Sequence, residues 1–459
     1  SSVRTAPARR RRFDWCAGSS PRTPVTCGSS ASILFARTGI PPECAGDVVK
    51  GVRIMGVLSE FSTGSALIVA GGRVLSVGAN TILTNGTFVD NTTGLSSNLE
   101  TGAVPVPSAF FNRPIGDRFA VGLGLFAPFG LTTEWDANTA QGRFYASRTQ
   151  LSAVYLQPTV AAQFGPVMLG VGLNISYLDV RLERRIDLAS TPVPGQPITF
   201  GQLGIPYGTD FASSTVEGTD WGVGYNLGAL VKVHDRIRAG ARYLSRQKFT
   251  KDDATARFAQ VPTGLVLTAG NPIGVPGGTP VDALLTSQFG SDGPFSTQAV
   301  STAIRLPEII AFGVSVKPVE QLNLMVDAQY TNWEVFTEVP LVFEKLGDQT
   351  LIENYVSTWS YRVGGEYAFG DAHDVRLRAG WLYNEAATPD ETVTPALPEN
   401  ERNVFTLGMG ARFGPVLTAD VGYMYVRQAD RIGRSRDVND GIYHDFDAHL
   451  IGVSFSFSY

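Results

Sequence analysis

The chain has 459 residues, of which 43% are hydrophobic and only 17% are charged, and its net charge is −5 at pH 7. Soluble globular proteins usually carry about 25% charged residues, yet the sequence contains no run of roughly 18 apolar residues that could form a membrane-spanning helix. The acidic balance also argues against a nucleic-acid partner. Low charge without a long apolar run is typical of a transmembrane β-barrel, in which apolar residues occupy alternate positions.

Residues 1–71 differ in composition from the rest of the chain. The segment contains a basic run, Arg9–Arg12, without the apolar core of a signal peptide after it. The chain's three cysteines, Cys16, Cys27 and Cys44, all lie here, and their spacing fits no metal site, so we expect neither a metal nor a cofactor. We interpret residues 1–71 as a diverged plug of a barrel lumen, with a disordered tail and a start-site or reading-frame error as alternatives.

From Gly72 to Tyr459, strand-like runs are separated by two kinds of connection. Short connections with turn residues occur at 113–117, 164–167, 232–236, 317–320, 369–372 and 413–416. Longer connections, rich in Thr, Pro, Gly and Asp, occur at 85–101, 128–142, 185–216, 253–301, 346–352, 386–400 and 429–443. Residues 72–459 are therefore predicted to form an all-β, antiparallel transmembrane barrel of about 14 strands, with the short turns and both termini in the periplasm.

Alternation within the runs supports this prediction. In 167–177, 221–231 and the closing run 451–459, apolar and aromatic residues alternate with Gly, Asn and Ser. The edge strand of a soluble β-sandwich would alternate as well, but it would not turn glycines and charges towards a dry core. The predicted inner faces carry both signs of charge, on Arg242, Asp327, Arg362, Glu366, Arg376, Arg378, Arg412 and Asp420.

Several motifs resemble those of one known family. The stretch from Val104 to Leu131, with Gly122-Leu123-Gly124-Leu125-Phe126-Ala127-Pro128-Phe129-Gly130-Leu131 at its end, is similar to the FadL/TodX family of outer-membrane hydrophobic-compound transporters. Gly142-Arg143-Phe144-Tyr145 then occupies the place of that family's Gly-Arg-aromatic motif. Further similarity is found, in order, at 221–228, 306–308, 330–333, 378–381 and 394–398.

Two features depart from the family pattern. The family's Asn-Pro-Ala motif before the first strand is missing, and the chain's Asn271-Pro272 lies in a long connection instead. Where the family often reads Tyr-Arg-Ser, this chain has Tyr243-Leu244-Ser245, flanked by two arginines. Because of these departures, neither the family's plug nor the role of its central arginine is carried over to this chain from the resemblance.

The resemblance implies a fourteen-stranded barrel in the bacterial outer membrane that takes up hydrophobic molecules passively. Substrate would be captured among the extracellular loops, bound in the lumen and released sideways into the bilayer. We expect long-chain fatty acids as substrate, with neutral or aromatic hydrocarbons as the alternative. The expected partners are the hydrophobic small molecule and outer-membrane lipid, and we expect the protein to be a monomer.

The residues suggest where substrate could bind. The apolar side chains in the long connections 185–216 and 253–301 could form a capture groove or could simply pack together. An inward arginine would suit a carboxylate, because a guanidinium pairs with it in two-pronged fashion, although wall ion-pair networks are the alternative role. The substrate-binding candidates are Phe126, Phe129, Arg242, Arg362, Arg376 and Arg378.

The sequence offers little for catalysis. It contains neither a Gly-x-Ser-x-Gly nor a His-Glu-x-x-His motif, so we predict that the protein is not an enzyme. Two other classes stay open as alternatives. One is an outer-membrane phospholipase, for which His449 is the plausible histidine although no motif identifies the serine. The other is a general porin.

Overall fold

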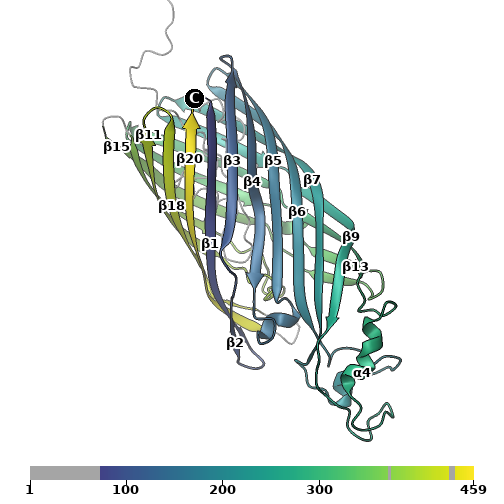
Figure 1. Cartoon of the computed structure of the whole chain (residues 1–459). Helices are drawn as coiled ribbons and strands as arrows, with labels where there is room; N and C mark the ends of the chain where they lie inside the picture. Colours follow the sequence, from purple (N-terminus) through teal and green to yellow (C-terminus); the bar gives the residue numbers. More distant parts are fainter. Residues whose placement is uncertain (1–72, 371–373, 434–439) are drawn as a thin grey trace, which may run out of the picture.

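The structure, a computed structural model, describes residues 73–370, 374–433 and 440–459. These residues form one antiparallel sheet that closes on itself, because the first strand, β1 (Val74–Asp90), pairs with the last, β20 (Gly441–Ser458). Figure 1 shows the two strands side by side, with the other strands following around the wall. Closure pairs every wall strand on both sides, as a sheet surrounded by lipid requires.

The wall consists of ten continuous strands and four that are each interrupted once, so the predicted number of strands is confirmed. The continuous strands are β1, β3 (Val104–Ile115), β4 (Phe119–Glu134), β5 (Arg148–Phe164), β6 (Val167–Asp187), β7 (Asp210–His234), β16 (Val375–Asn384), β17 (Arg402–Phe413), β18 (Leu417–Gln428) and β20. The interrupted strands are β8 and β9 (Ile237–Leu244, Gln247–Gln260), β10 and β11 (Gln298–Leu306, Ile309–Val319), β12 and β13 (Leu322–Thr331, Glu338–Phe343), and β14 and β15 (Gln349–Ile352, Thr358–Phe369). Two short strands, β2 (Ser96–Asn98) and β19 (Arg431–Ile432), pair at the rim.

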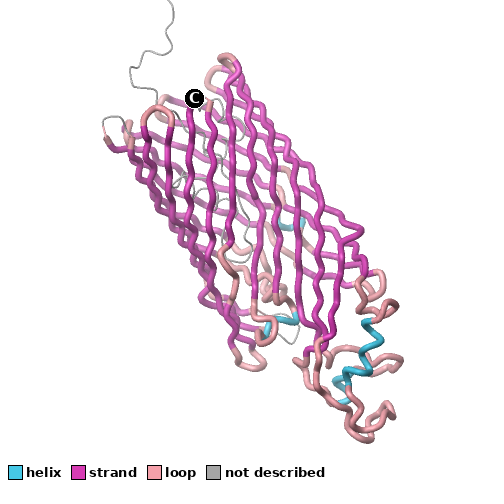
Figure 2. Tube along the Cα trace, viewed as in Figure 1, coloured by secondary structure: helices cyan, strands magenta, loops and turns pink. Residues whose placement is uncertain are grey.

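The connections alternate in length as the sequence predicted. Tight turns close one end, which also holds the C-terminus, and the long loops lie at the other, where Figure 2 shows the short helices. Several strands nevertheless run further than predicted: β4 continues to Glu134, and β9 to Gln260, inside connections that the sequence marked as loops. The outer face of these extensions carries charged residues, so the apolar alternation that identifies a strand in lipid is missing there.

The outward side chains show where the lipid lies. Exposed apolar residues cover the middle of the wall, and exposed aromatic residues gather near both ends, as in the aromatic girdles of membrane barrels. Near the turns these include Phe119, Phe164, Phe369, Phe413 and Phe457; nearer the loops they include Tyr177, Trp221, Tyr225 and Tyr361. No helix of the described residues is long and apolar enough to span a membrane.

The predictions for residues 1–71, including the three cysteines, lie outside the described residues. The site is therefore described from the wall and the loops. Short helices at the loop end are η2 (Gln141–Phe144), η3 (Phe200–Leu203), α4 (Val281–Leu285) and η4 (Thr286–Phe289), whereas η5 (Trp333–Val335) lies in the interruption between β12 and β13.

Candidate substrate-binding site and exit path

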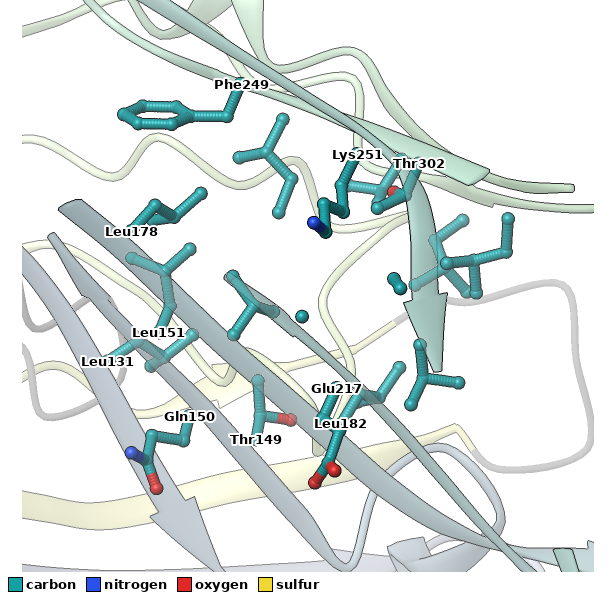
Figure 3. A pocket seen from close by; sticks show the side chains of 18 of the residues that line it. Leu131, Thr149, Gln150, Leu151, Leu178, Leu182, Glu217, Phe249, Lys251 and Thr302 are labelled. Atoms are coloured by element: carbon teal, nitrogen blue, oxygen red, sulfur yellow. The ribbon is translucent and has the colours of Figure 1, made fainter. Parts of the chain in front are cut away.

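An apolar cavity of about 140 Å³ lies inside the loop half of the barrel. Its walls come from β4 to β7, β9, β10, β13 and β14, with a contribution from the loop that contains Ala396 and Leu397. Figure 3 shows leucines of neighbouring strands, among them Leu131, Leu151 and Leu178, facing the same space. The apolar lining is Leu131, Leu151, Leu178, Val180, Leu182, Val216, Phe249, Ala254, Ile304, Phe336, Val339, Leu341, Leu351, Ala396 and Leu397.

This lining has a local cause in β6. In the middle of the barrel the inward positions of β6 are Gly170, Gly172, Asn174 and Ser176. Two residues further on, at Leu178, the inward positions become aliphatic and stay so through Val180 to Leu182. The switch makes the loop half of the lumen apolar, while the middle is lined with small and polar groups. A hydrophobic molecule would therefore gain most by burial in the loop half.

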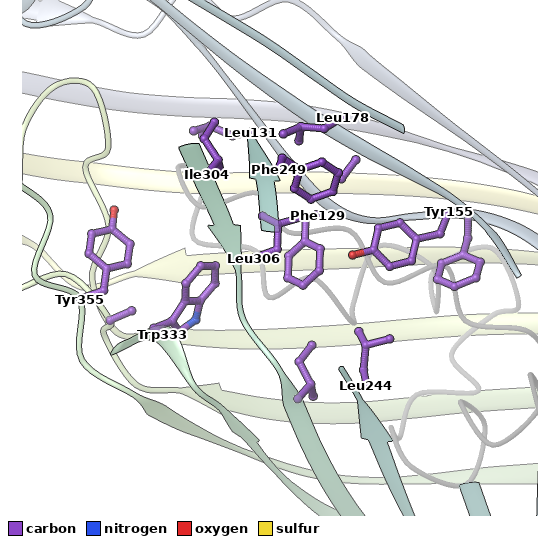
Figure 4. Close-up of a cluster of buried hydrophobic side chains, with 14 of the residues drawn as sticks. Phe129, Leu131, Tyr155, Leu178, Leu244, Phe249, Ile304, Leu306, Trp333 and Tyr355 are labelled. Atoms are coloured by element: carbon purple, nitrogen blue, oxygen red, sulfur yellow. The ribbon is translucent and has the colours of Figure 1, made fainter. Parts of the chain in front are cut away.

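The cavity continues into a buried aromatic cluster that contains both phenylalanines proposed from the sequence. Phe126 and Phe129 are almost completely buried, and their rings lie 5.8 Å and 6.2 Å from that of Tyr155. Leu178 and Phe249, both labelled in Figure 4, belong to this cluster and also line the cavity. The structure thus places Phe126 and Phe129 beside the cavity.

Among the described residues that line the cavity, Lys251 is the one cation, and Glu217, Asp220 and Glu353 are the acidic residues. Figure 3 shows its amino group directed into the space between the leucines. The Nζ atom pairs with Asp253 Oδ1 at 2.6 Å, and the Asp253 side chain is 79% exposed, so water competes for this partner. A carboxylate arriving in the cavity could therefore replace Asp253 with little loss.

The sequence analysis missed Lys251, although its spacing carried a usable signal. Lys251 lies two residues after the inward-facing Phe249 and so shares its face of β9. The ladder between β9 and β10 then shifts register next to Lys251. We expected the strand to end here, and so did not assign Lys251 to the lumen.

The wall is interrupted next to Phe126. The strand β3 pairs with β1 from Val104 onward, but it pairs with β4 only from Ala109 to Ile115. Nearer the loops the two segments meet again, where Glu100 N donates to Glu134 O at 2.7 Å. Between these points the edges of β3 and β4 lack ladder pairing among the described residues.

Proline helps to explain the interruption. Pro105 and Pro107 on β3 and Pro128 on β4 have no N–H to donate. At Pro128 the pairing of β4 with β5 also shifts register, between Phe126 and Phe129, which marks a bulge. Val104, Val106 and Ala127 beside the interruption pack in a second apolar cluster. An apolar surface therefore extends from the cavity, past Phe126, to the break in the wall.

None of the four proposed arginines lines the cavity. Arg378 Nε pairs with Glu366 Oε2 at 2.7 Å, and its Nη1 pairs with Asp420 Oδ1 at 2.8 Å. Arg362 lies 3.5 Å from Asp327 and donates from Nη2 to Gln329 at 2.8 Å. These inward arginines thus join the wall networks that the sequence offered as the alternative role.

The other two arginines also belong to the inner wall. Arg242 is buried and donates from Nε to Asn226 Oδ1 at 3.4 Å. Arg376 is partly buried, two residues before Arg378 on the same face of β16. The structure therefore separates the arginines, which lie in the turn half and middle of the barrel, from the apolar cavity.

The two long loops form a core of their own. The rings of Phe211, Phe289 and Phe295 pack against one another, mostly edge to face, with centroids 5.3 to 6.2 Å apart, and Phe200, Ile205 and Leu285 are buried with them. Asp282 ties the loop 261–280 to α4, because its carboxylate accepts from Thr263 N at 2.9 Å. Burial alone would raise the pKa of Asp282, but the hydrogen bonds from Thr263 and Gly264 outweigh it and hold the pKa below its usual value.

A closed barrel with an apolar cavity at one end and a side break in its wall is a structure suited to moving lipophilic molecules. The family model described as outer membrane protein transport protein (OMPP1/FadL/TodX) matches residues 58–459. The chain belongs to this family. The family's members are outer-membrane transporters of hydrophobic compounds, and this protein's place is the bacterial outer membrane.

Named relatives agree with this assignment. Outer membrane protein P1 of Haemophilus influenzae is 25% identical over 434 residues, covering 87% of this chain and 86% of the relative. A long-chain fatty acid transport protein of Escherichia coli is 25% identical over 346 residues, covering 73% and 72%. The solved structure of a Pseudomonas aeruginosa FadL homologue superposes with a TM-score of 0.73 at 20% identity, over 94% of this chain and all of the other.

Proposed function

We propose that the protein carries long-chain fatty acids passively across the outer membrane, through the loop-side cavity and out between β3 and β4. The observation that supports this most directly is the ammonium group of Lys251, the one cation among the described residues of a mainly apolar lining that also includes Glu217, Asp220 and Glu353. An alkyl chain would bury apolar surface against Leu178, Ile304 and their neighbours at roughly 25 cal/mol per Å². Its carboxylate would pair with Lys251.

We place substrate binding in the lumen rather than between the long loops. The loop side chains proposed for capture, such as Phe200 and Leu285, are buried in the loop core and offer little open apolar surface. The cavity, in contrast, has room: an apolar cavity of about 150 Å³ holds a benzene-sized molecule. Several methylene groups would fit there, and the rest of a long chain would extend along Phe129 and Phe126 towards the break.

Release would be sideways. The chain end near Phe126 would meet the unpaired edges of β3 and β4, where Val106 and Ala127 continue the apolar surface. A lipophile leaving there enters the hydrocarbon of the bilayer and avoids the polar lumen below it. The driving force is the concentration difference alone, since the path itself demands no energy source.

Uptake of radiolabelled oleate, in cells that lack their own fatty acid transporter, tests the proposal. We expect Ile304→Trp, which fills the cavity, to reduce uptake to near background. The matched control is Val314→Trp, because Val314 is 44% exposed on the lipid-facing side of β11. Equal uptake by the filled and the control variants would refute the cavity as the binding site.

Neutral or aromatic hydrocarbons are the alternative substrate. They would use the same cavity, but they would gain nothing from Lys251. Competition separates the two: if decane displaces labelled toluene while oleate and palmitate do not, the hydrocarbon function is favoured. A deletion strain whose growth on oleate and on hydrocarbons is unchanged would contradict both.

A further inference from the structure

Two cations that form no ion pair with any described residue lie next to each other on the outer surface of the barrel. Lys248 on β9 and Arg305 on β10 are directly opposite in the antiparallel ladder, and both side chains are exposed. Their neighbours Phe249 and Ile304 are also register partners and are buried in the lumen. Strand alternation therefore directs Lys248 and Arg305 to the outside of the wall.

Such a pair is unfavourable by itself. Residues directly opposite in an antiparallel ladder have Cβ atoms about 4.5–5.5 Å apart, and like charges at that distance destabilise the sheet. Within the described part of the chain, neither cation forms an ion pair: the exposed Asp252 and Glu338 of the flanking strand segments pair with neither. Arg246 is a third exposed cation, next to the patch formed by Lys248 and Arg305. It is already held by Glu308, with Nε 2.6 Å from Oε2.

Other outward cations of the same wall are neutralised by carboxylates. Arg181 Nε lies 2.5 Å from Glu183 Oε1, and Arg257 pairs with Glu217. These pairs lie further towards the loops on β6, β7 and β9. Lys248 and Arg305, in contrast, face each other with like charge and form no ion pair among the described residues, so an external anion would lower the energetic cost of the pair.

The position of Lys248 and Arg305 on the barrel indicates which kind of anion they would meet. The rings of Tyr225 and Tyr243, 5.7 Å apart and facing outward, immediately precede the patch along the wall, and the 67% exposed Trp221 lies on the adjoining strand β7. Exposed tyrosine and tryptophan mark the boundary between hydrocarbon and headgroups. Because this girdle is the one nearer the long loops, the patch faces the headgroup region of the external leaflet.

We propose that Lys248 and Arg305 together bind a phosphate group of the glycolipid in the external leaflet, the phosphorylated lipid A of lipopolysaccharide. Arginine and lysine form short charge-assisted hydrogen bonds to phosphate, and a dianionic group can satisfy two adjacent cations at once. The acyl chains of the same lipid would lie along the apolar outer wall below Tyr243. The bound lipid would thereby stabilise β9 and β10, which form one side of the cavity.

Binding of lipid A by the full-length protein in detergent tests the proposal. Native mass spectrometry would compare bisphosphorylated lipid A with its dephosphorylated form, on the wild type and on Lys248→Gln/Arg305→Gln. We expect the double substitution to weaken binding of bisphosphorylated lipid A about tenfold or more, because two charge-assisted contacts are lost. Lys232→Gln/Arg236→Gln removes two exposed cations near a periplasmic turn and is the matched control.

A second measurement separates binding from folding. In lipid-free detergent, Arg305→Glu should raise the unfolding temperature, because it converts a repulsive pair into an attractive one; in micelles with lipid A it should lower the stabilisation that the lipid confers. Binding that inorganic phosphate abolishes would indicate a free-phosphate site instead. Equal affinity of the wild type and the Gln/Gln variant for bisphosphorylated lipid A would overturn the proposal, as would equal affinity of the wild type for both lipids.

Discussion

Replacing Lys251 with methionine should distinguish a fatty acid transporter from a hydrocarbon channel. Methionine keeps the length and apolar stem of lysine and removes only the ammonium group. A hydrogen bond to a charged group contributes about 1.5–3 kcal/mol. Because the Lys251 side chain is 32% exposed and must give up Asp253, we take the lower end of that range.

That lower end, roughly 1.5 kcal/mol, corresponds to a loss of affinity for oleate of slightly more than tenfold. Toluene or decane should bind as well as before, or slightly better, since no desolvated amine faces them. Isothermal titration calorimetry on the protein in lipid nanodiscs measures both ligands under the same conditions. Lys251→Arg should retain oleate binding, because the positive charge is kept.

The control variant is Lys232→Met, since Lys232 lies near a periplasmic turn and pairs with Asp235 away from the cavity. An oleate affinity that is unchanged in Lys251→Met would refute the proposed carboxylate contact. An equal loss for oleate and toluene would show that the substitution alters the shape of the cavity, and the charge argument would fail.

Three further outcomes are expected. In a background without the native cysteines, a disulfide between Val106→Cys and Ala127→Cys should close the break between β3 and β4, and oleate uptake should fall several-fold and return on reduction. Arg378→Met should destabilise the barrel in urea by about 3–5 kcal/mol, because it leaves two carboxylates without their cation in the inner wall. Loop stability should depend on Asp282: its lowered pKa means that the carboxylate's contribution is present above the usual Asp range and is lost as the pH falls below it.

Each of these has its own measurement. For the cysteine pair, each single substitution is the control, and undiminished uptake by the oxidised protein would contradict lateral release. For Arg378, the variant Arg378→Lys should recover part of the stability, and a change below about 1 kcal/mol would contradict an essential ion pair. For Asp282, proteolysis of the loops from pH 7 to pH 3 should become faster at low pH in the wild type, whereas Asp282→Asn should be equally sensitive throughout.

The sequence by itself determined the architecture. Alternation with period two survives in the lipid-facing part of each strand, because lipid on one side and the lumen on the other demand opposite side chains at successive positions. The closing run 451–459 and the six short turns could therefore be recognised in the sequence, and the number of strands followed from them. Where strands rise beyond the lipid, as β9 does after Lys251, both faces tolerate polar residues and the prediction placed loops instead.

Only the tertiary structure decided which inward residues surround a binding site. Phe126 and Phe129 came from the sequence, and they do lie beside the cavity. The arginines were chosen for their charge and their inward position, yet Arg378 pairs with Glu366 on the adjacent strand β15 and reaches across β17 to Asp420 on β18, contacts that depend on the register of the ladders. Lys251 and the outward pair Lys248 and Arg305 acquire their significance in the same way, because the pairing of β9 with β10 depends on register across a loop of more than thirty residues, which no local pattern encodes.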